Sequence, residues 1–469
     1  MSFDKGKIYA NLRRLLHLVG VNRAVFFGAL SKIWFAAAGA VTLILIAVRF
    51  TPELQGYYFT FYSLVSLQIF VELGMTAVII NFSSHEWSKL KLGENGQVIG
   101  DERALSRLRS LVKVVFLWYR VGAVILLVGM GLAGFIFFSL SANTGVSWVP
   151  PWLALCLLTA VNLSILPSFS LLEGCNQVAQ VYFYRFIQEV IRSISIWTII
   201  LLGGGLWSLS GSTFAIVAWA VVFLFAKYRN FFRTLFLPAQ GAIIDWRKEV
   251  WPMQWRIAVS WLSGYFIYPI FTPALFHFGG PVVAGQMGMT LSMVLALNMI
   301  SSMWILTKAP QFGIFIAKKE YNNLDKLLVH STLSAFGIAV LGALIIFSFV
   351  SFIYANNLAI AERFLPPFLT AFFLAAIVLM QISYGQSTYL RAHKKEPFVM
   401  LSAMTAILTA LSVLIAGSRW GAFGIVVLYF SIVALFVIPG GTIIWLRCRD
   451  KWHSHEETFE SVMLADAGA

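Results

Sequence analysis

The sequence predicts an all-α integral membrane protein with about twelve transmembrane helices. Of its 469 residues, 59% are hydrophobic, and the mean hydropathy is +0.82, which excludes a soluble globular protein. Apolar stretches long enough to cross a bilayer follow one another from Ala24 to Leu446. Lys and Arg fall almost entirely into alternate connections between these stretches, which is the positive-inside pattern of a polytopic membrane protein.

The distribution of basic residues predicts the orientation. They precede the first stretch and fill every second connection, for example at Arg13, Lys91, Arg229, Lys318 and Lys395. The other connections hold little beyond Arg49, Arg363 and Arg419. Both termini are therefore predicted to be cytoplasmic, with an even number of spans. Connections on the opposite side are short and leave no external domain for chemistry. The net charge of +14 is explained by orientation and by attraction to anionic headgroups, so we expect no nucleic-acid partner.

The predicted elements follow in order. Residues 1–23 are basic and amphipathic, and we expect a cytoplasmic segment at the membrane surface that leads into a retained first span. The predicted spans are 24–49, 54–83, 112–140, 148–172, 180–202, 209–227, 251–278, 282–306, 330–355, 365–388, 397–417 and 420–446.

The longest connections, 84–111 and 228–250, are both predicted to be cytoplasmic. The second divides the spans equally, so it is the predicted linker between two lobes. The resulting domains are an N-lobe at 24–227, the linker at 228–250, a C-lobe at 251–447 and a cytoplasmic tail at 448–469. A short echo, Phe50 with Gly56 and Phe278 with Gly285, favours an internal repeat of the kind found in transporters.

The fifth span carries the clearest polar stripe. Tyr182, Arg185, Glu189 and Arg192 recur at helical spacing on one face, and Glu189 can partly neutralise both arginines, leaving one net positive charge. One interpretation is a structural ion-pair stripe that holds this helix to its neighbours. The other is the wall of a water-filled cavity that attracts an anionic substrate.

Three further charged residues lie within the first three spans. Lys32 and Arg120 lie about two turns from their predicted cytoplasmic ends, where either could snorkel to the headgroups. Glu72 has a shorter side chain and cannot do so. It is either the partner of Lys32 or Arg120, or a protonatable coupling site.

The seventh span presents aromatic residues instead. Trp261, Tyr265 and Tyr268 share one stripe, with Pro269 and Pro273 as predicted kinks. Such a surface suits apolar and sugar-ring contacts, although aromatic residues are also ordinary helix-packing material. We find no phosphate-binding loop, no zinc-protease or nucleophile motif, and no His/Cys cluster, and Cys156, Cys175 and Cys448 are scattered. We therefore expect no catalytic residue, metal or cofactor.

Five short segments carry a family resemblance: Phe50–Tyr58, Phe70–Gly74, Trp255–Trp261 with Gly264 and Tyr265, Ala284–Gly288 and Thr307–Pro310. In these segments and in its span layout, the chain resembles bacterial polysaccharide biosynthesis proteins of the oligosaccharide (Wzx-type) flippase kind. Those proteins are members of the multidrug/oligosaccharidyl-lipid/polysaccharide exporter superfamily. The family has no strict active-site signature, so the resemblance transfers no residue's role.

The resemblance implies two six-helix lobes that face each other across a central cavity and alternate in access. It implies a bacterial inner-membrane flippase that turns an undecaprenyl-pyrophosphate-linked oligosaccharide from the inner to the outer leaflet, for surface polysaccharide synthesis. Membrane lipids and glycan-assembly proteins are the implied partners, and the architecture can work as a monomer. The candidate substrate-binding residues of the cavity are Lys32, Glu72, Arg120, Arg185, Glu189, Arg192, Trp261, Tyr265 and Tyr268.

Other functions stay open. One is an ion-coupled drug or small-metabolite antiporter of the same superfamily, with Glu72 as its coupling acid. A membrane glycan polymerase or ligase is disfavoured, because such enzymes generally need long external loops. A structural scaffold for glycan assembly would not require the charged stripe of the fifth span.

Overall fold

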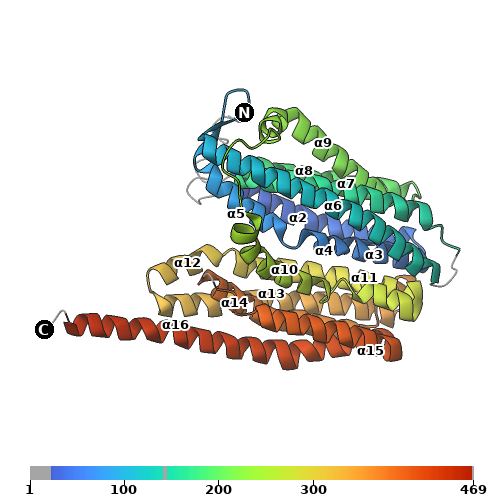
Figure 1. The fold of residues 1–469 in the computed structure, drawn as a ribbon. Helices are drawn as coiled ribbons and strands as arrows, with labels where there is room; N and C mark the ends of the chain where they lie inside the picture. The colour runs from blue at the N-terminus through green and yellow to red at the C-terminus, as the bar shows by residue number, and fades with distance from the viewer. Residues whose placement is uncertain (1–22, 141–144, 394, 467–469) are drawn as a thin grey trace, which may run out of the picture. The chain divides into compact units, whose positions relative to one another are not determined.

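The computed structural model describes residues 23–140, 145–393 and 395–466, and these residues are almost entirely helical (Figure 1). The predicted amino-terminal segment lies largely outside them. The elements in chain order are α2 (Arg23–Arg49), α3 (Pro52–Val65), η1 (Ser66–Gln68), α4 (Ile69–Glu72), α5 (Met75–Trp87), β1 (Leu90–Leu92), β2 (Val98–Gly100), α6 (Glu102–Leu140), α7 (Val149–Gly174), α8 (Val178–Leu201), α9 (Trp207–Leu235), η2 (Trp246–Val250), α10 (Trp251–Tyr265), α11 (Phe271–Leu306), α12 (Ala309–Ala317), α13 (Tyr321–Ala355), η3 (Ala359–Arg363), α14 (Pro367–Ala392), α15 (Val399–Ile432), η4 (Val433–Val437) and α16 (Ile438–Asp466).

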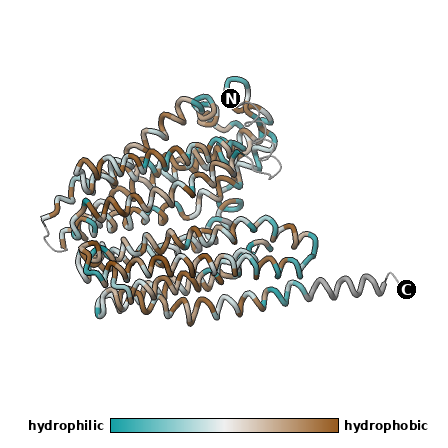
Figure 2. The backbone as a smooth tube through the Cα atoms, turned by 180° about the vertical axis from the view of Figure 1, so that it is seen from behind, coloured by the Kyte–Doolittle hydropathy of each residue, from teal (hydrophilic) through white to brown (hydrophobic). Residues whose placement is uncertain are grey.

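Long apolar helices dominate both halves of the chain (Figure 2). Among the described residues, 8 helices are long and apolar enough to cross a membrane, or 9 if the bent pair α3–α4 and α5 is one span. Two runs hold more than one predicted span, because the backbone turns at Gly280 (φ 82°) and at Gly421 (φ 58°). The positive φ at both sites suits glycine. The charges of α8 explain why it is not among these apolar helices.

The second predicted span is not continuous. Its helix ends at Glu72, and α5 begins at Met75, bent by 44°. The two residues between them, Leu73 (φ 44°) and Gly74 (φ 70°), are both left-handed. The single helix expected over 54–83 is therefore wrong. Glycine accepts this conformation readily, whereas leucine rarely does, so the surrounding packing has to hold the break.

The kink predicted at Pro269 in the seventh span is confirmed, whereas Pro273 lies in the first turn of α11 and interrupts no helix. Helix α10 ends at Tyr265, and the chain makes turns up to Ile270 before α11 begins. Pro269 lies within this interruption, where its missing N–H leaves the helical ladder incomplete. The hydroxyl of Ser63 donates a hydrogen bond to the Pro269 carbonyl oxygen.

The chain forms two compact units. The first holds the described residues of Met1–Phe50 and Leu64–Ala258, and the second holds Thr51–Ser63 with those of Val259–Ala469. In the first unit α2 packs against α8, α8 against α9, and α7 against α5, α6 and α9. In the second unit α11 packs against α13, α14 and α15, and α14 packs against α16.

The start of α3 is an integral part of the second unit. Gln55 Nε2 donates to the carbonyl oxygens of Gly285, at 2.8 Å, and Arg363, at 3.0 Å. A Cβ atom at Gly56 would overlap the backbone of Pro281, so glycine allows the two segments to touch. The two halves of the predicted sequence echo, around Gly56 and Gly285, thus lie against each other.

The predicted cytoplasmic connections are shorter than the sequence suggested. Within 84–111, β1 and β2 form an antiparallel hairpin with Lys91 opposite Ile99, and α6 already begins at Glu102. Helix α9 extends to Leu235, so only 236–245 separates it from η2. Amphipathic continuation of helices beyond the apolar stretches accounts for both differences.

Candidate functional site

The charged stripe of the fifth span lies on α8, but its pairing differs from the prediction. Arg185 Nη2 lies 2.7 Å from Glu173 Oε2 at the end of α7, and the guanidinium lies 5.4 Å from the centre of the Tyr182 ring. Glu189 was expected to neutralise both arginines and serves only Arg192. With Glu173 included, two arginines face two glutamates, so the predicted net positive charge of the stripe is cancelled locally.

Arg192 is the less tightly held of the two arginines. Its Nε lies 3.9 Å from Glu189 Oε2, which is too long for a hydrogen bond. That nitrogen is buried and has no hydrogen-bond partner among the described residues. The side chain as a whole is 36% exposed. Arg192 therefore has donors available for another group, whereas Arg185 is already engaged.

The side of the stripe next to Glu189 is packed rather than open. Ser193 is 8% exposed, accepts a hydrogen bond from Trp34 Nε1 at 3.3 Å and donates to the Glu189 carbonyl oxygen at 2.8 Å. One turn further, Trp197 Nε1 donates to Thr42 Oγ1 at 2.9 Å. These bonds hold α8 to α2, which supports the structural interpretation for this side of the helix.

Lys32 on α2 and Arg120 on α6 are both exposed. Within the described part of the chain neither makes an ion pair, and neither is the partner of Glu72. Exposed cations on membrane helices are what snorkelling predicts, and they are equally available to an anionic ligand.

Among the charged residues of the predicted set, Glu72 is the buried one, at 8% exposure. It makes no hydrogen bond or ion pair with any described group. Its surroundings hold the break in the second span in place. Trp118 Nε1 on α6 donates to the Val71 carbonyl oxygen at 3.0 Å, and Gly122 on α6 leaves room for the Val71 side chain.

The aromatic stripe of the seventh span divides into two parts. Tyr265 is 7% exposed, and the Tyr268 hydroxyl accepts a hydrogen bond of 2.8 Å from Tyr429 on α15. Trp261 is 40% exposed. The two tyrosines therefore contribute to helix packing in the second unit, and only Trp261 presents a broad surface.

Sequence reasoning missed the uncharged polar groups inside the second unit. Gln381 Nε2 donates to Asn298 Oδ1 at 3.0 Å, and Asn298 Nδ2 donates to the Tyr384 hydroxyl at 3.2 Å. This network links α11 to α14. The available signal was an amide with apolar neighbours in each helix, Asn298 in α11 and Gln381 in α14, which a pattern of charges does not reveal.

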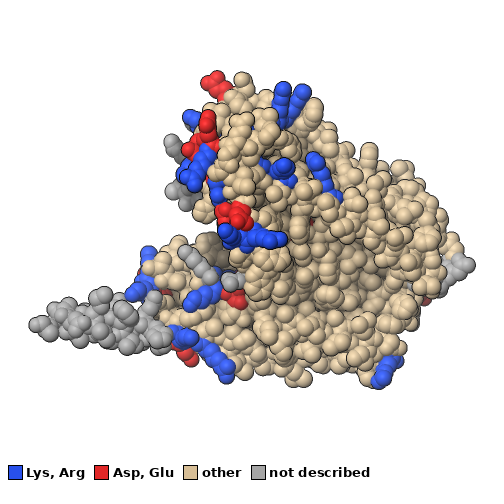
Figure 3. All heavy atoms as spheres, viewed as in Figure 1, with Lys and Arg blue, Asp and Glu red and all other residues tan. Residues whose placement is uncertain are grey.

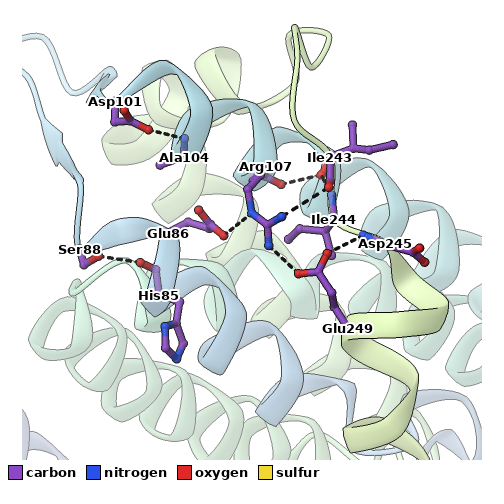
Figure 4. Close-up of polar contacts among 11 residues, drawn as sticks. His85, Glu86, Ser88, Asp101, Ala104, Arg107, Ile243, Ile244, Asp245 and Glu249 are labelled. Atoms are coloured by element: carbon purple, nitrogen blue, oxygen red, sulfur yellow. Dashed lines mark hydrogen bonds and ion pairs between the residues drawn. The ribbon is translucent and has the colours of Figure 1, made fainter.

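The predicted linker lies within the first unit, where ion pairs join it to the rest of that unit (Figure 4). Arg107 Nε lies 2.7 Å from Glu86 Oε1, and Arg107 Nη2 lies 2.6 Å from Glu249 Oε2. The hydrogen bond from Arg107 lowers the pKa of the Glu249 carboxyl below its ordinary value. On the face shown in Figure 3, most charged side chains lie toward the left of the view, and the right-hand part is mostly uncharged.

The comparisons with known proteins rest on structure alone. Neither a family model nor a curated protein sequence matches the chain. An inward-facing multidrug resistance MATE family transporter of the MOP superfamily is similar, with TM-score 0.62 and 13% identity over 90% of this chain and 96% of that one. The chain has the fold of a MOP-superfamily transporter.

Two further structures carry the same fold. The lipid II flippase MurJ in an inward closed conformation has TM-score 0.54 and 12% identity over 90% of this chain and 87% of that one. The MATE multidrug transporter DinF-BH in complex with R6G has TM-score 0.52 and 15% identity, covering 91% and 95%. The predicted all-α membrane fold with two helical lobes is confirmed. In the described residues no group of three or more His, Cys, Asp or Glu could hold a metal ion.

Proposed function

We propose that this protein is a flippase for a lipid-linked oligosaccharide, carried as an undecaprenyl-pyrophosphate conjugate across a bacterial inner membrane. It would use no enzymatic step and would work by alternating access of its lobes. The observation that carries the proposal is the charge on the predicted membrane part of the first unit. The acids Glu173 and Glu189 are matched by arginines, whereas Lys32 and Arg120 are exposed and make no ion pair there.

A pyrophosphate is the chemical group that this arrangement suits. Arg and Lys donors form short, charge-assisted hydrogen bonds to phosphate oxygens, and Arg can do so with two parallel bonds. Arg192, with a buried donor left over, is the arginine that we assign to this role. The likeness in fold to the lipid II flippase MurJ supports a lipid-linked substrate of this class.

Reconstitution of the purified protein into liposomes tests the proposal. A short-chain lipid-pyrophosphate oligosaccharide with a fluorescent sugar would be placed in both leaflets, and a lectin added outside would report how fast the inner pool becomes accessible. We expect protein-dependent exposure, reduced in Lys32→Ala and Arg120→Ala. Equal rates with protein-free liposomes would refute the proposed substrate class.

A second candidate is an ion-coupled drug or small-metabolite antiporter. It is favoured by the likeness to the MATE transporter and by the buried acid Glu72. Dye-loaded liposomes with an imposed ion gradient distinguish the two: gradient-driven efflux without oligosaccharide transfer would support the antiporter.

A further inference from the structure

Specific contacts hold the break in the second span, which lies directly after Glu72. Helix α4 ends at this residue, and the next two residues are left-handed. Trp118 of α6 satisfies the carbonyl oxygen of Val71, which the break removes from the helical ladder. Gly122 and Gly74 allow Val71 and Ile257 respectively to approach closely. Three contacts thus hold a carboxyl group at an interrupted membrane helix.

Among the described residues around Glu72, no group compensates its charge. On α6, Tyr119 is fully buried and lies near Glu72, but its phenol group supplies no positive charge. Arg120, its neighbour in sequence, is exposed and does not pair with Glu72. The chain continues into α5 with the uncharged Met75 and Thr76, and α10 contributes Ile257 beside Gly74. The neighbouring Arg256 has a side chain outside the described set.

A carboxylate buried without a counter-charge is strongly disfavoured, and such groups take up a proton instead of remaining ionised. Glu72 lies about eleven residues from the predicted cytoplasmic end of its span, or roughly 16 Å along a helix. Snorkelling is closed to its short side chain. Discontinuous membrane helices also commonly mark ion-binding sites in secondary transporters.

We propose that Glu72 is a proton-binding site of the transport cycle. In the conformation described here the carboxyl group holds a proton taken from the aqueous phase. A movement that wets the break between α4 and α5 would release that proton to water and leave a carboxylate. The assignment holds for either substrate class, because it concerns the ion and not the cargo.

The test uses dicyclohexylcarbodiimide, an apolar reagent that modifies protonated carboxyl groups within membranes. The full-length protein in liposomes would be treated over a range of pH, and the modified glutamates located by peptide mass spectrometry. We expect Glu72 to be modified and the yield to fall severalfold as the pH rises. Glu173 and Glu189, which face arginines, are the matched controls and should remain unmodified at every pH.

Three outcomes would overturn the proposal. Absence of modification at all pH values in folded protein would mean that the carboxylate is paired, and a gain in Arg120→Ala or Arg256→Ala would identify the partner. A yield that does not change up to alkaline pH would mean a permanently protonated structural residue. Protection by sodium at constant pH would mean a sodium site. None of these readouts needs a transported substrate, so failure of the proposed flippase activity is a separate result.

Discussion

At the scale of single residues, the two arginines of α8 have different environments and should respond differently to substitution. Arg192→Ala removes a charge whose donors are available, so oligosaccharide transfer should fall strongly at unchanged membrane abundance. Arg192→Lys keeps the charge but loses the planar fork, so oligosaccharide transfer should fall only partly. Glu189→Gln should reduce transfer less than Arg192→Ala does, because it also removes repulsion toward an anion. Normal transfer by Arg192→Ala would contradict the anion-binding role.

Arg185 is the matched control. Its partner Glu173 has a side chain that is only 15% exposed, so Arg185→Ala leaves a nearly buried carboxylate without a counter-charge. We expect a loss of stability on the order of 1 kcal/mol, discounted because Arg185 is itself 40% exposed. Thermal unfolding followed by size-exclusion chromatography measures it. A loss of activity without any loss of stability would reverse the roles assigned to the two arginines.

The pair Arg107–Glu249 gives a pH-dependent contact. Arg107 lowers the pKa of Glu249, so the folded state prefers the carboxylate. The resulting stabilisation is complete above the ordinary carboxyl pKa of about 4.3, and it is lost as the pH falls through the lowered value. Glu249→Gln should break the contact with Arg107 at neutral pH and so release the segment that carries residue 249.

Limited trypsin digestion measures this release. Cleavage after Arg247 or Lys248 should be faster in Glu249→Gln and Arg107→Gln than in the native protein. Glu396→Gln, which removes an exposed ion pair with Arg391, serves as the control and should be cleaved after Arg247 and Lys248 at the native rate. Unchanged cleavage in both test variants would mean that the ion pair does not hold the linker.

At the scale of elements, the exposure of α8 predicts a labelling pattern. Cysteines replacing Arg185 and Glu189 should react with a small water-soluble thiol reagent, because both positions are partly exposed among polar groups. A cysteine at Ser193 should be protected, since that position packs against Trp34. Ile194 is 50% exposed on an apolar face, so its cysteine should meet lipid and remain unlabelled. Reaction at all positions alike would contradict this division of the helix.

The contact between Gly56 and Pro281 gives a second element-scale prediction. Gly56→Ala places a methyl group against backbone that cannot move easily, and should destabilise the second unit by about 1–3 kcal/mol. Gly39→Ala on α2 has open space around it and serves as the control, with no loss expected. The melting temperatures of the two purified variants measure this difference in stability. Similar values would mean that the segments separate at little cost.

At the scale of the whole molecule, the charge pattern predicts one membrane orientation. Reporter fusions at Gly96, Ala239 and Ala469 should show cytoplasmic activity, and a fusion at Gly204 should report the outside. An external signal at Ala239 would overturn the predicted orientation.

Sequence periodicity and charge predict the number and order of the helices, because these depend on each segment's own composition. Pro269 likewise predicts the kink in its own segment. The ion pair between Glu173 and Arg185 depends on how α7 and α8 pack, which no local pattern encodes. The left-handed Leu73 also gives no local signal. A leucine adopts that conformation only when its neighbours require it, here through Trp118 and Gly122 on another helix.

The membership of Thr51–Ser63 in the second unit has a consequence for biogenesis. The hydrogen bond from Gln55 to Gly285 joins residues separated by 230 positions. At ribosomal rates of about 5–20 residues per second, Gln55 waits roughly 10 to 50 s before its partner has been synthesised. During that interval a glutamine destined for burial lies in the membrane without its acceptor. Insertion factors that shield polar segments would act on this nascent hairpin, and slowing translation between α3 and α11 would lengthen its exposure.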